Sequence, residues 1–205
     1  MIEYELLALS DLLDSDDYDK NIIAGHFQAF KCKRDTDLET FLQDKAIEYD
    51  EKGFGKTFLF LDSNKLKQEE KPEFCIMAYF TIAMAALDMT DISAKKKRKI
   101  FGEHPGRDTV KSMPTFLIGQ LGRCDKYSHD DLAGNQILDE CYSVISRAAR
   151  IIGGKVLLLE CREHMYGKFY EDQNFRKLND SLNESKLYTL YKRIDFSEYW
   201  KEEPS

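Results

Sequence analysis

The sequence lacks the features that mark membrane and secreted proteins. Its longest stretch without a charged residue, 74–87, is shorter than the ~20 residues that a membrane-spanning helix needs. The first five residues, MIEYE, lack the basic start of a secretory signal. We therefore expect a cytoplasmic protein that contacts no membrane.

Cysteine and histidine are also too few and too scattered to hold a metal. No two of the four histidines have the spacing of a metal site on one helix face. The odd set of five cysteines contains no CxxC pair, which argues against a disulfide framework or a zinc site. We assign no metal and expect reduced, partly buried thiols at Cys32, Cys75, Cys124, Cys141 and Cys161.

Length and charge then limit the class of protein. A chain of 205 residues with 42% hydrophobic residues can bury the core of a single domain spanning 1–205. The net charge of -7 argues against a general nucleic-acid binder. The run KKKRK at 95–99 is a local exception. It is either the solvated face of an insertion or a surface for nucleic acid or an acidic partner.

Apolar patterning predicts alternating strands and helices. Strands are expected at 1–9, 56–62, the first half of 74–86, 115–121 (after Pro114), 156–160 and 187–194. Helices are expected at 37–50, with Thr36 and Glu39 as a capping box, and at 133–152 and 164–172. We expect a polar turn at 63–72 and a loop at 101–113.

The order strand, loop, helix, strand over 115–160 indicates a right-handed crossover between parallel strands. The predicted fold class is therefore α/β, with a mixed, partly parallel central sheet flanked by helices. Ligands of such units bind at the carboxyl ends of the strands and at the helix N-terminus, here residues 122–135. This loop is poor in glycine and carries Asp125, Asp130 and Asp131, which weighs against phosphate.

Residues 114–175 resemble the core of GNAT-type N-acetyltransferases in four features that occur in the family's order. IGQL at 118–121 resembles the strand that pairs with the pantetheine arm of acetyl-CoA. HDDLAG at 129–134 stands where the family has its pyrophosphate loop, and the helix and strand that follow also match. FYEDQNF at 169–175 resembles the Phe-Tyr-Glu-x-x-Gly-Phe signature, with Asn174 in place of glycine.

The N-terminal half resembles the GNAT branch that includes tRNA-acetylating toxins. The matching positions extend the resemblance to about 30–194, and they are Phe30-Lys31-Cys32, Leu38, Phe41-Leu42, Ala46, Gly53 and Lys56-Thr57-Phe58. The phosphate loop departs from the family, because His129 replaces Gln or Arg and Leu132 replaces a glycine. Backbone N–H donors do not depend on the side chain, so the loop can still bind phosphate.

The resemblance implies an acetyl-CoA-dependent transfer of an acetyl group to the primary amine of a small molecule or peptide by direct attack. Tyr170 matches the tyrosine that protonates the leaving thiolate, and its ordinary pKa of ~10 suits this role. Glu160 is the expected base, with Glu163 and Asp125 as alternatives. The implied acetyl-CoA-binding residues are Leu121, Gly122, Arg123, His129, Asp131, Leu132, Ala133, Gly134 and Asn135.

Two alternatives stay open at this point. One is a tRNA-acetylating toxin, the only reading in which nucleic acid is a partner, and the other is a catalytically degenerate binding module on a GNAT scaffold. Segments 10–30 and 90–113 are expected to be variable and to lie on the substrate side. Whether the chain is a homodimer, as is common in the family, also stays open. Nothing near Cys124 or Cys161 suggests an activated thiolate.

Overall fold

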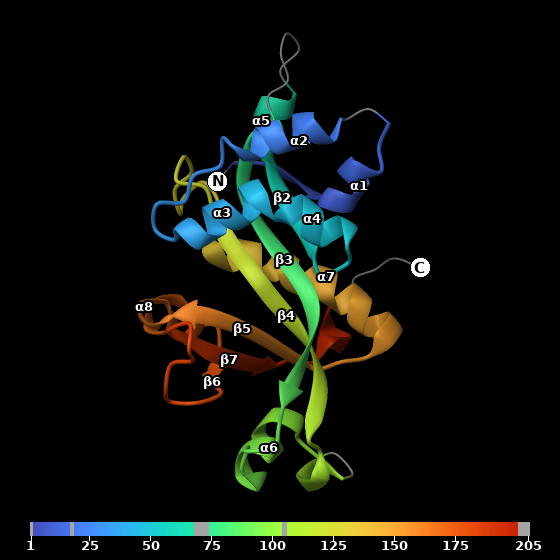
Figure 1. The fold of residues 1–205 in the computed structure, drawn as a ribbon, viewed down its shortest axis with the longest axis vertical. Coiled ribbons are helices and arrows are strands. Elements are labelled where there is room, and N and C mark those ends of the chain that lie inside the picture. The colour runs from blue at the N-terminus through green and yellow to red at the C-terminus, as the bar shows by residue number, and fades with distance from the viewer. Residues whose placement is uncertain (1, 17–18, 68–73, 104–105, 201–205) are drawn as a thin grey trace. The chain divides into compact units, whose positions relative to one another are not determined.

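The computed structural model describes residues 2–16, 19–67, 74–103 and 106–200 (Figure 1). These residues form a mixed sheet with the strand order β1-β2-β3-β4-β5-β7-β6. The strands are β1 (Tyr4–Ala8), β2 (Lys56–Asp62), β3 (Ile76–Asp88), β4 (Ser112–Arg123), β5 (Val156–Arg162), β6 (Arg176–Lys177) and β7 (Leu187–Arg193).

Helices connect these strands. The α-helices are α1 (Leu9–Leu13), α2 (Lys20–Phe27), α3 (Thr36–Asp44), α4 (Ala46–Glu51), α5 (Ser63–Leu66), α6 (Ala94–Phe101), α7 (Gly134–Ile152) and α8 (Glu163–Met165). The shorter turns are η1 (Arg107–Thr109), the π-helical η2 (Tyr166–Tyr170) and η3 (Phe196–Glu198). Within the described part of the chain, no helix is long and apolar enough to cross a bilayer.

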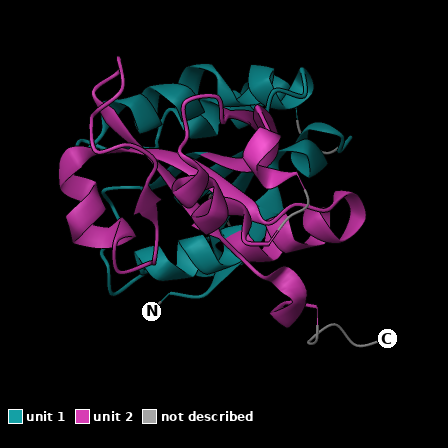
Figure 2. Cartoon of the chain, turned by 90° about the horizontal axis from the view of Figure 1, so that it is seen from below, with its two compact units in different colours: residues 1–83, 119–141 teal, residues 84–118, 142–205 magenta. Residues whose placement is uncertain are grey.

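The chain divides into two compact units (Figure 2). Unit 1 contains residues 1–83 and 119–141, and unit 2 contains residues 84–118 and 142–205. Strands β3 and β4 and helix α7 each contribute residues to both units.

Unit 1 is a helix-covered antiparallel arrangement. The predicted hairpin of β2 and β3 is present, and β1 pairs antiparallel to the other edge of β2. Figure 1 shows α3 and α4 lying over β2 and β3. The apolar side chains of α1 to α4 form one buried cluster with those of the strands, which includes Leu9, Phe27, Phe30, Leu42, Leu59, Leu61 and Tyr79.

The capping box and the continuity of the helix predicted at 37–50 were wrong. Asp35, not Thr36, caps α3, because its carboxylate accepts the Asp37 N–H at 3.3 Å. Glu39 bonds the Lys31 ammonium at 2.8 Å and the Cys32 N–H at 3.0 Å instead of closing a capping box. Lys45, with φ -126°, then separates α3 from α4.

Unit 2 contains the predicted parallel crossover. Phe116 to Ile118 of β4 pair parallel with Leu157 to Leu159 of β5, and α7 connects the two strands. On its other edge β5 pairs antiparallel with β7, which also pairs with β6. A buried cluster joins α6 to these strands through Leu87, Met89, Ile100, Phe101, Val156, Leu158, Leu178 and Tyr191.

Local boundaries differ from the prediction in three places. Strand β4 starts at Ser112 and contains Pro114, which is tolerated because the ladder with β5 begins only at Phe116. The loop expected at 101–113 holds the end of α6, η1 and the start of β4. The turn expected at 63–72 begins with α5, and 68–73 lies outside the described residues.

Candidate active site

In unit 1, a short hydrogen-bonded turn connects β4 to α7. The Asp131 carboxylate accepts the Ser128 N–H at 2.7 Å and the Ser128 hydroxyl at 2.8 Å, while Ser128 Oγ accepts the Asp131 N–H at 3.3 Å. This reciprocal pattern is that of a capping box, with Asp in place of Glu. The turn therefore has a defined shape without glycine, and the spacing Ser-x-x-Asp was the sequence signal for it.

The N-terminus of α7 follows directly from this turn. Leu132 is fully buried, and the Ala133 N–H donates to the Gln136 side chain at 2.8 Å. The N–H groups of Gly134 and Asn135, at the first positions of α7, have no acceptor within the helix. Such a helix end is a general anion-binding site, so the predicted phosphate position is chemically sound.

The acidic residues of the loop oppose an anion less than their number suggests. Asp125 accepts the Lys33 N–H at 2.7 Å and pairs with Arg34 at 3.3 Å. The N–H and hydroxyl of Ser128 lower the pKa of the Asp131 carboxyl, whose charge is thereby compensated locally. The Asp130 and His129 side chains are exposed, where water and salt screen them.

Arg123 supplies the positive charge at this position. Its Nη1 donates to the Leu132 carbonyl at 2.6 Å, whereas its buried Nε has no hydrogen-bond partner in the described part of the chain. Burial lowers the pKa of this guanidinium from its ordinary value. A buried cationic donor without an acceptor is costly.

Gly122 lies against helix α3. A Cβ at this position would lie 2.8 Å from Leu38 Cδ1, so a larger residue would require the end of this flexible side chain to move.

In unit 2, the predicted base Glu160 lies on β5 beyond the parallel ladder, which ends at Leu159. Its side chain is exposed, and its Oε1 accepts Asn183 Nδ2 at 2.7 Å and Thr189 Oγ1 at 3.3 Å. Both bonds are made by Oε1, not by Oε2, and together they fix the orientation of the carboxylate. The alternative base Glu163 accepts the Tyr188 hydroxyl at 3.2 Å.

Tyr170 ends the π-helical turn η2 and is 7% exposed. Its ring packs edge-to-face on Phe169 and Phe175, with centroid distances of 5.0 and 5.7 Å. The Phe175 N–H donates to the Tyr170 carbonyl at 3.0 Å, and Asn174 has the left-handed φ of 62° expected for the residue that replaces glycine. The FYEDQNF segment therefore forms a compact aromatic turn.

Lys177 of β6 was not singled out from the sequence. Its ammonium lies 3.7 Å from the ring centroid of Tyr188 and 4.6 Å from that of Tyr166. The spacing of residues in the sequence does not predict this cation–π contact, because its three side chains come from β6, η2 and β7. Nearby on β5, burial raises the pKa of Cys161 to about 11, so this thiol is protonated at neutral pH.

The predicted site residues thus form two groups. Unit 1 contains the β4 end and the turn with Leu121, Gly122, Arg123, His129, Asp131, Leu132, Ala133, Gly134 and Asn135. Unit 2 contains Tyr170 and Glu160. In the described residues, no group of three or more His, Cys, Asp or Glu side chains is arranged to hold a metal ion.

Structural comparison finds the same fold in bacterial toxins, whereas no protein-family model matches the sequence. The AtaT toxin complexed with acetyl-methionyl-tRNAfMet has a TM-score of 0.64 and 18% identity, over 93% of this chain and 95% of that one. A mutant AtaT toxin bound to acetyl-CoA and to the C-terminus of the antitoxin AtaR has a TM-score of 0.62 and 16% identity, over 93% of this chain and 92% of that one. A mutant of KacT has a TM-score of 0.68 and 14% identity, over 97% of this chain and 98% of that one. These similarities confirm the predicted fold.

Proposed function

We propose that this chain is an acetyl-CoA-dependent N-acetyltransferase. The observation that carries the proposal is the parallel crossover in which β4 leads through a hydrogen-bonded turn to the open N-terminus of α7, next to the Arg123 guanidinium. The same fold occurs in an AtaT structure that contains acetyl-CoA. Acetyl-CoA carries a pyrophosphate, and helix N–H groups and a guanidinium are donors that bind such an anion.

Unit 1 binds and orients acetyl-CoA in this proposal. The N–H groups of Gly134 and Asn135 and the Arg123 guanidinium bind the pyrophosphate. A backbone N–H of the β4 end, at 121–123, donates to the acetyl carbonyl oxygen and stabilises the negative charge that develops there. Asp131 and Ser128 keep the turn in shape, so they act on affinity through its geometry.

The residues of unit 2 move the protons. The substrate amine attacks the acetyl carbon, a C–N bond forms, and the C–S bond breaks. Glu160 takes the proton that the amine loses, and Tyr170 gives its hydroxyl proton to the sulfur of the leaving group. Solvent returns the proton from Glu160 to Tyr170, so atoms and charge balance over one turnover.

A second candidate specifies the acceptor as the amine of an aminoacyl-tRNA. It is favoured by the similarity to AtaT in complex with acetyl-methionyl-tRNAfMet. The exposed cations of α6 also suit a nucleic acid. The net charge of -7 requires that such binding be confined to a local surface.

Calorimetry with acetyl-CoA tests the shared premise of both candidates. We expect saturable binding, and absence of binding at millimolar acetyl-CoA would contradict the proposal. Release of free thiol in the presence of amines, polyamines, peptides and aminoacyl-tRNAs then identifies the acceptor. Binding without thiol release from any acceptor would instead support a non-enzymatic module.

A further inference from the structure

The segment 88–113 is basic in an acidic chain. It contains seven Lys or Arg against four Asp or Glu, whereas the whole chain has a net charge of -7. Helix α6, which carries KKKRK, lies in this segment between β3 and β4. The proposed catalytic roles use none of these residues.

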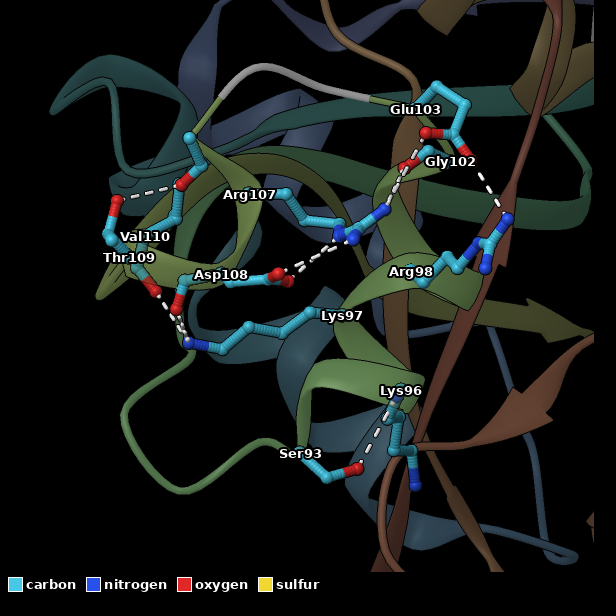
Figure 3. A network of polar contacts seen from close by, with 11 residues as sticks. Ser93, Lys96, Lys97, Arg98, Gly102, Glu103, Arg107, Asp108, Thr109 and Val110 are labelled. Atoms are coloured by element: carbon cyan, nitrogen blue, oxygen red, sulfur yellow. Dashed lines mark hydrogen bonds and ion pairs between the residues drawn. The ribbon is translucent and has the colours of Figure 1, made fainter.

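Two of the lysines fasten the helix to its surroundings. Lys97 is 7% exposed, and its ammonium donates to the carbonyls of Val110 at 2.9 Å and Asp108 at 3.3 Å (Figure 3). The Lys96 ammonium donates to the Leu178 carbonyl. Because both ammonium groups donate to backbone carbonyls, they are not available to bind a partner.

The apolar face of α6 is also fixed. Ile100 is fully buried and Phe101 is 8% exposed, both in the cluster that includes Met89 and Val156. At the start of the helix the Ser93 hydroxyl accepts the Lys96 N–H at 3.4 Å. Helix α6 is therefore held within unit 2 as an ordered platform.

The cations that remain face the solvent. Lys95, Arg98 and Lys99 are exposed, and within the described residues no ion pair involves Lys95 or Lys99. The exposed pair of Arg98 with Glu103 at 3.2 Å is weak in water and exchanges readily. Lys95 and Lys99 are one helical turn apart, so they lie on the same face of α6.

The composition of this face selects the partner class. Exposed large hydrophobic side chains occur elsewhere in the described chain, but none lies in the described part of 88–113. A protein interface requires an apolar centre, and a membrane surface requires apolar anchors. Isolated exposed cations without apolar side chains match a sugar–phosphate backbone.

We propose that α6 is a docking surface for the phosphate backbone of an RNA substrate, contacted by Lys95, Lys99 and the intervening Arg98. The inference rests on the second candidate function, because it assigns the acceptor RNA a binding surface within unit 2. Contacts to phosphate carry no sequence information, so α6 contributes affinity and not tRNA identity.

The test uses the full chain and deacylated bulk tRNA, with fluorescence anisotropy over a salt series. The double variant Lys95→Gln with Lys99→Gln should raise Kd roughly 10-fold and lower the slope of log K against log salt by about 2. The matched control, Lys45→Gln with Lys155→Gln, removes two exposed charges outside 88–113 and should leave the slope unchanged. Equal slopes for both double variants would overturn the proposal.

Two further measurements separate the possible failures. Thermal unfolding should be the same for both double variants, since only exposed side chains change. If acetyl-CoA binds but the tRNA slope does not respond, the docking surface is wrong and the acetyltransferase stands. If acetyl-CoA does not bind, the proposed function fails whatever the tRNA result. Polyglutamate that competes as well as tRNA at equal charge would indicate an acidic protein partner and would contradict the RNA assignment.

Discussion

The turn at 128–136 and the segment at 160–177 acquire their order in different ways. Within 128–136, the hydrogen bonds of the turn's own side chains join residues three apart, such as Ser128 with Asp131 and Ala133 with Gln136. In the segment, the contacts of Glu160 reach 23 and 29 residues along the chain, to Asn183 and Thr189. The first is encoded by its own residues, and the second depends on β7 being in place.

This difference teaches where each kind of substitution should act. The turn is proposed to bind ligand through backbone donors, so a change in its local geometry should alter affinity and stability. The side chains of 160–177 are held by distant residues and are proposed to transfer protons, so a change there should alter the rate. Each prediction below tests this division.

The largest effect is expected for Tyr170→Phe. The substitution removes one hydroxyl and keeps the ring on Phe169 and Phe175, so kcat should fall roughly 10²- to 10⁴-fold with little change in acetyl-CoA affinity. Tyr188→Phe is a matched control, because Tyr188 is also 7% exposed but its hydroxyl bonds Glu163. Steady-state kinetics and calorimetry measure both; equal losses of rate would show that Tyr170 has only a packing role.

A smaller loss of rate is expected for Glu160→Gln. The amide keeps an oxygen for Asn183 and Thr189 but cannot take a proton, so kcat should fall roughly 10²-fold. Glu163→Gln should retain the rate, and an unchanged kcat in the Glu160 variant would remove Glu160 as the base.

Arg123→Met should act on binding. Without the guanidinium, the pyrophosphate loses a charged donor, so Kd for acetyl-CoA should rise roughly 10-fold while the rate at saturation stays close to wild type. Calorimetry and kcat at saturating acetyl-CoA measure the two effects. Arg123→Lys keeps the charge, so its Kd should lie between those of the wild type and the Met variant. An unchanged Kd in the Met variant would contradict the assigned role.

Asp131→Ala should lower the melting temperature by a few degrees. Its folded-state carboxyl has a lowered pKa because it accepts the Ser128 N–H and hydroxyl, so the ionised form is the stabilising one. The stabilisation is complete above the ordinary carboxyl pKa of ~3.9 and is lost as the pH falls through the lower folded-state pKa. Thermal melts from pH 6 to acid should show the difference from wild type disappearing, and a difference independent of pH would contradict this account.

The smallest effect is expected for Cys161→Ser. Burial raises the thiol pKa to about 11, so only about one thousandth of it is thiolate at pH 8, and direct transfer needs no cysteine. The rate should stay within about twofold of wild type, and alkylation of Cys161 should accelerate as the pH approaches 11. An acyl-enzyme burst that vanishes in this variant would refute direct transfer.

The sequence predicted the regular parts of the fold well. The strand at 56–62 and the antiparallel hairpin were confirmed, as was the parallel crossover through α7. It missed α1 and α2 within 9–27, because helices of five and eight residues are too short to show a clear apolar period. It also placed a loop where α6 ends and η1 begins, because the buried lysine that joins them has no signal in the sequence.

The sequence by itself determined the elements whose information is local. Apolar period defined the long helix and the strands, the spacing Ser-x-x-Asp encoded the turn before α7, and Asn174 marked a left-handed residue. Only the tertiary structure decided which charges are available. Lys96, Lys97 and Asp125 are bonded to backbone groups, whereas Lys95, Lys99 and Asp130 face water. The physical reason is that these charged side chains bond to backbone groups of segments far away in the sequence. The sequence around a charged residue does not show which distant segment will lie next to it in the fold.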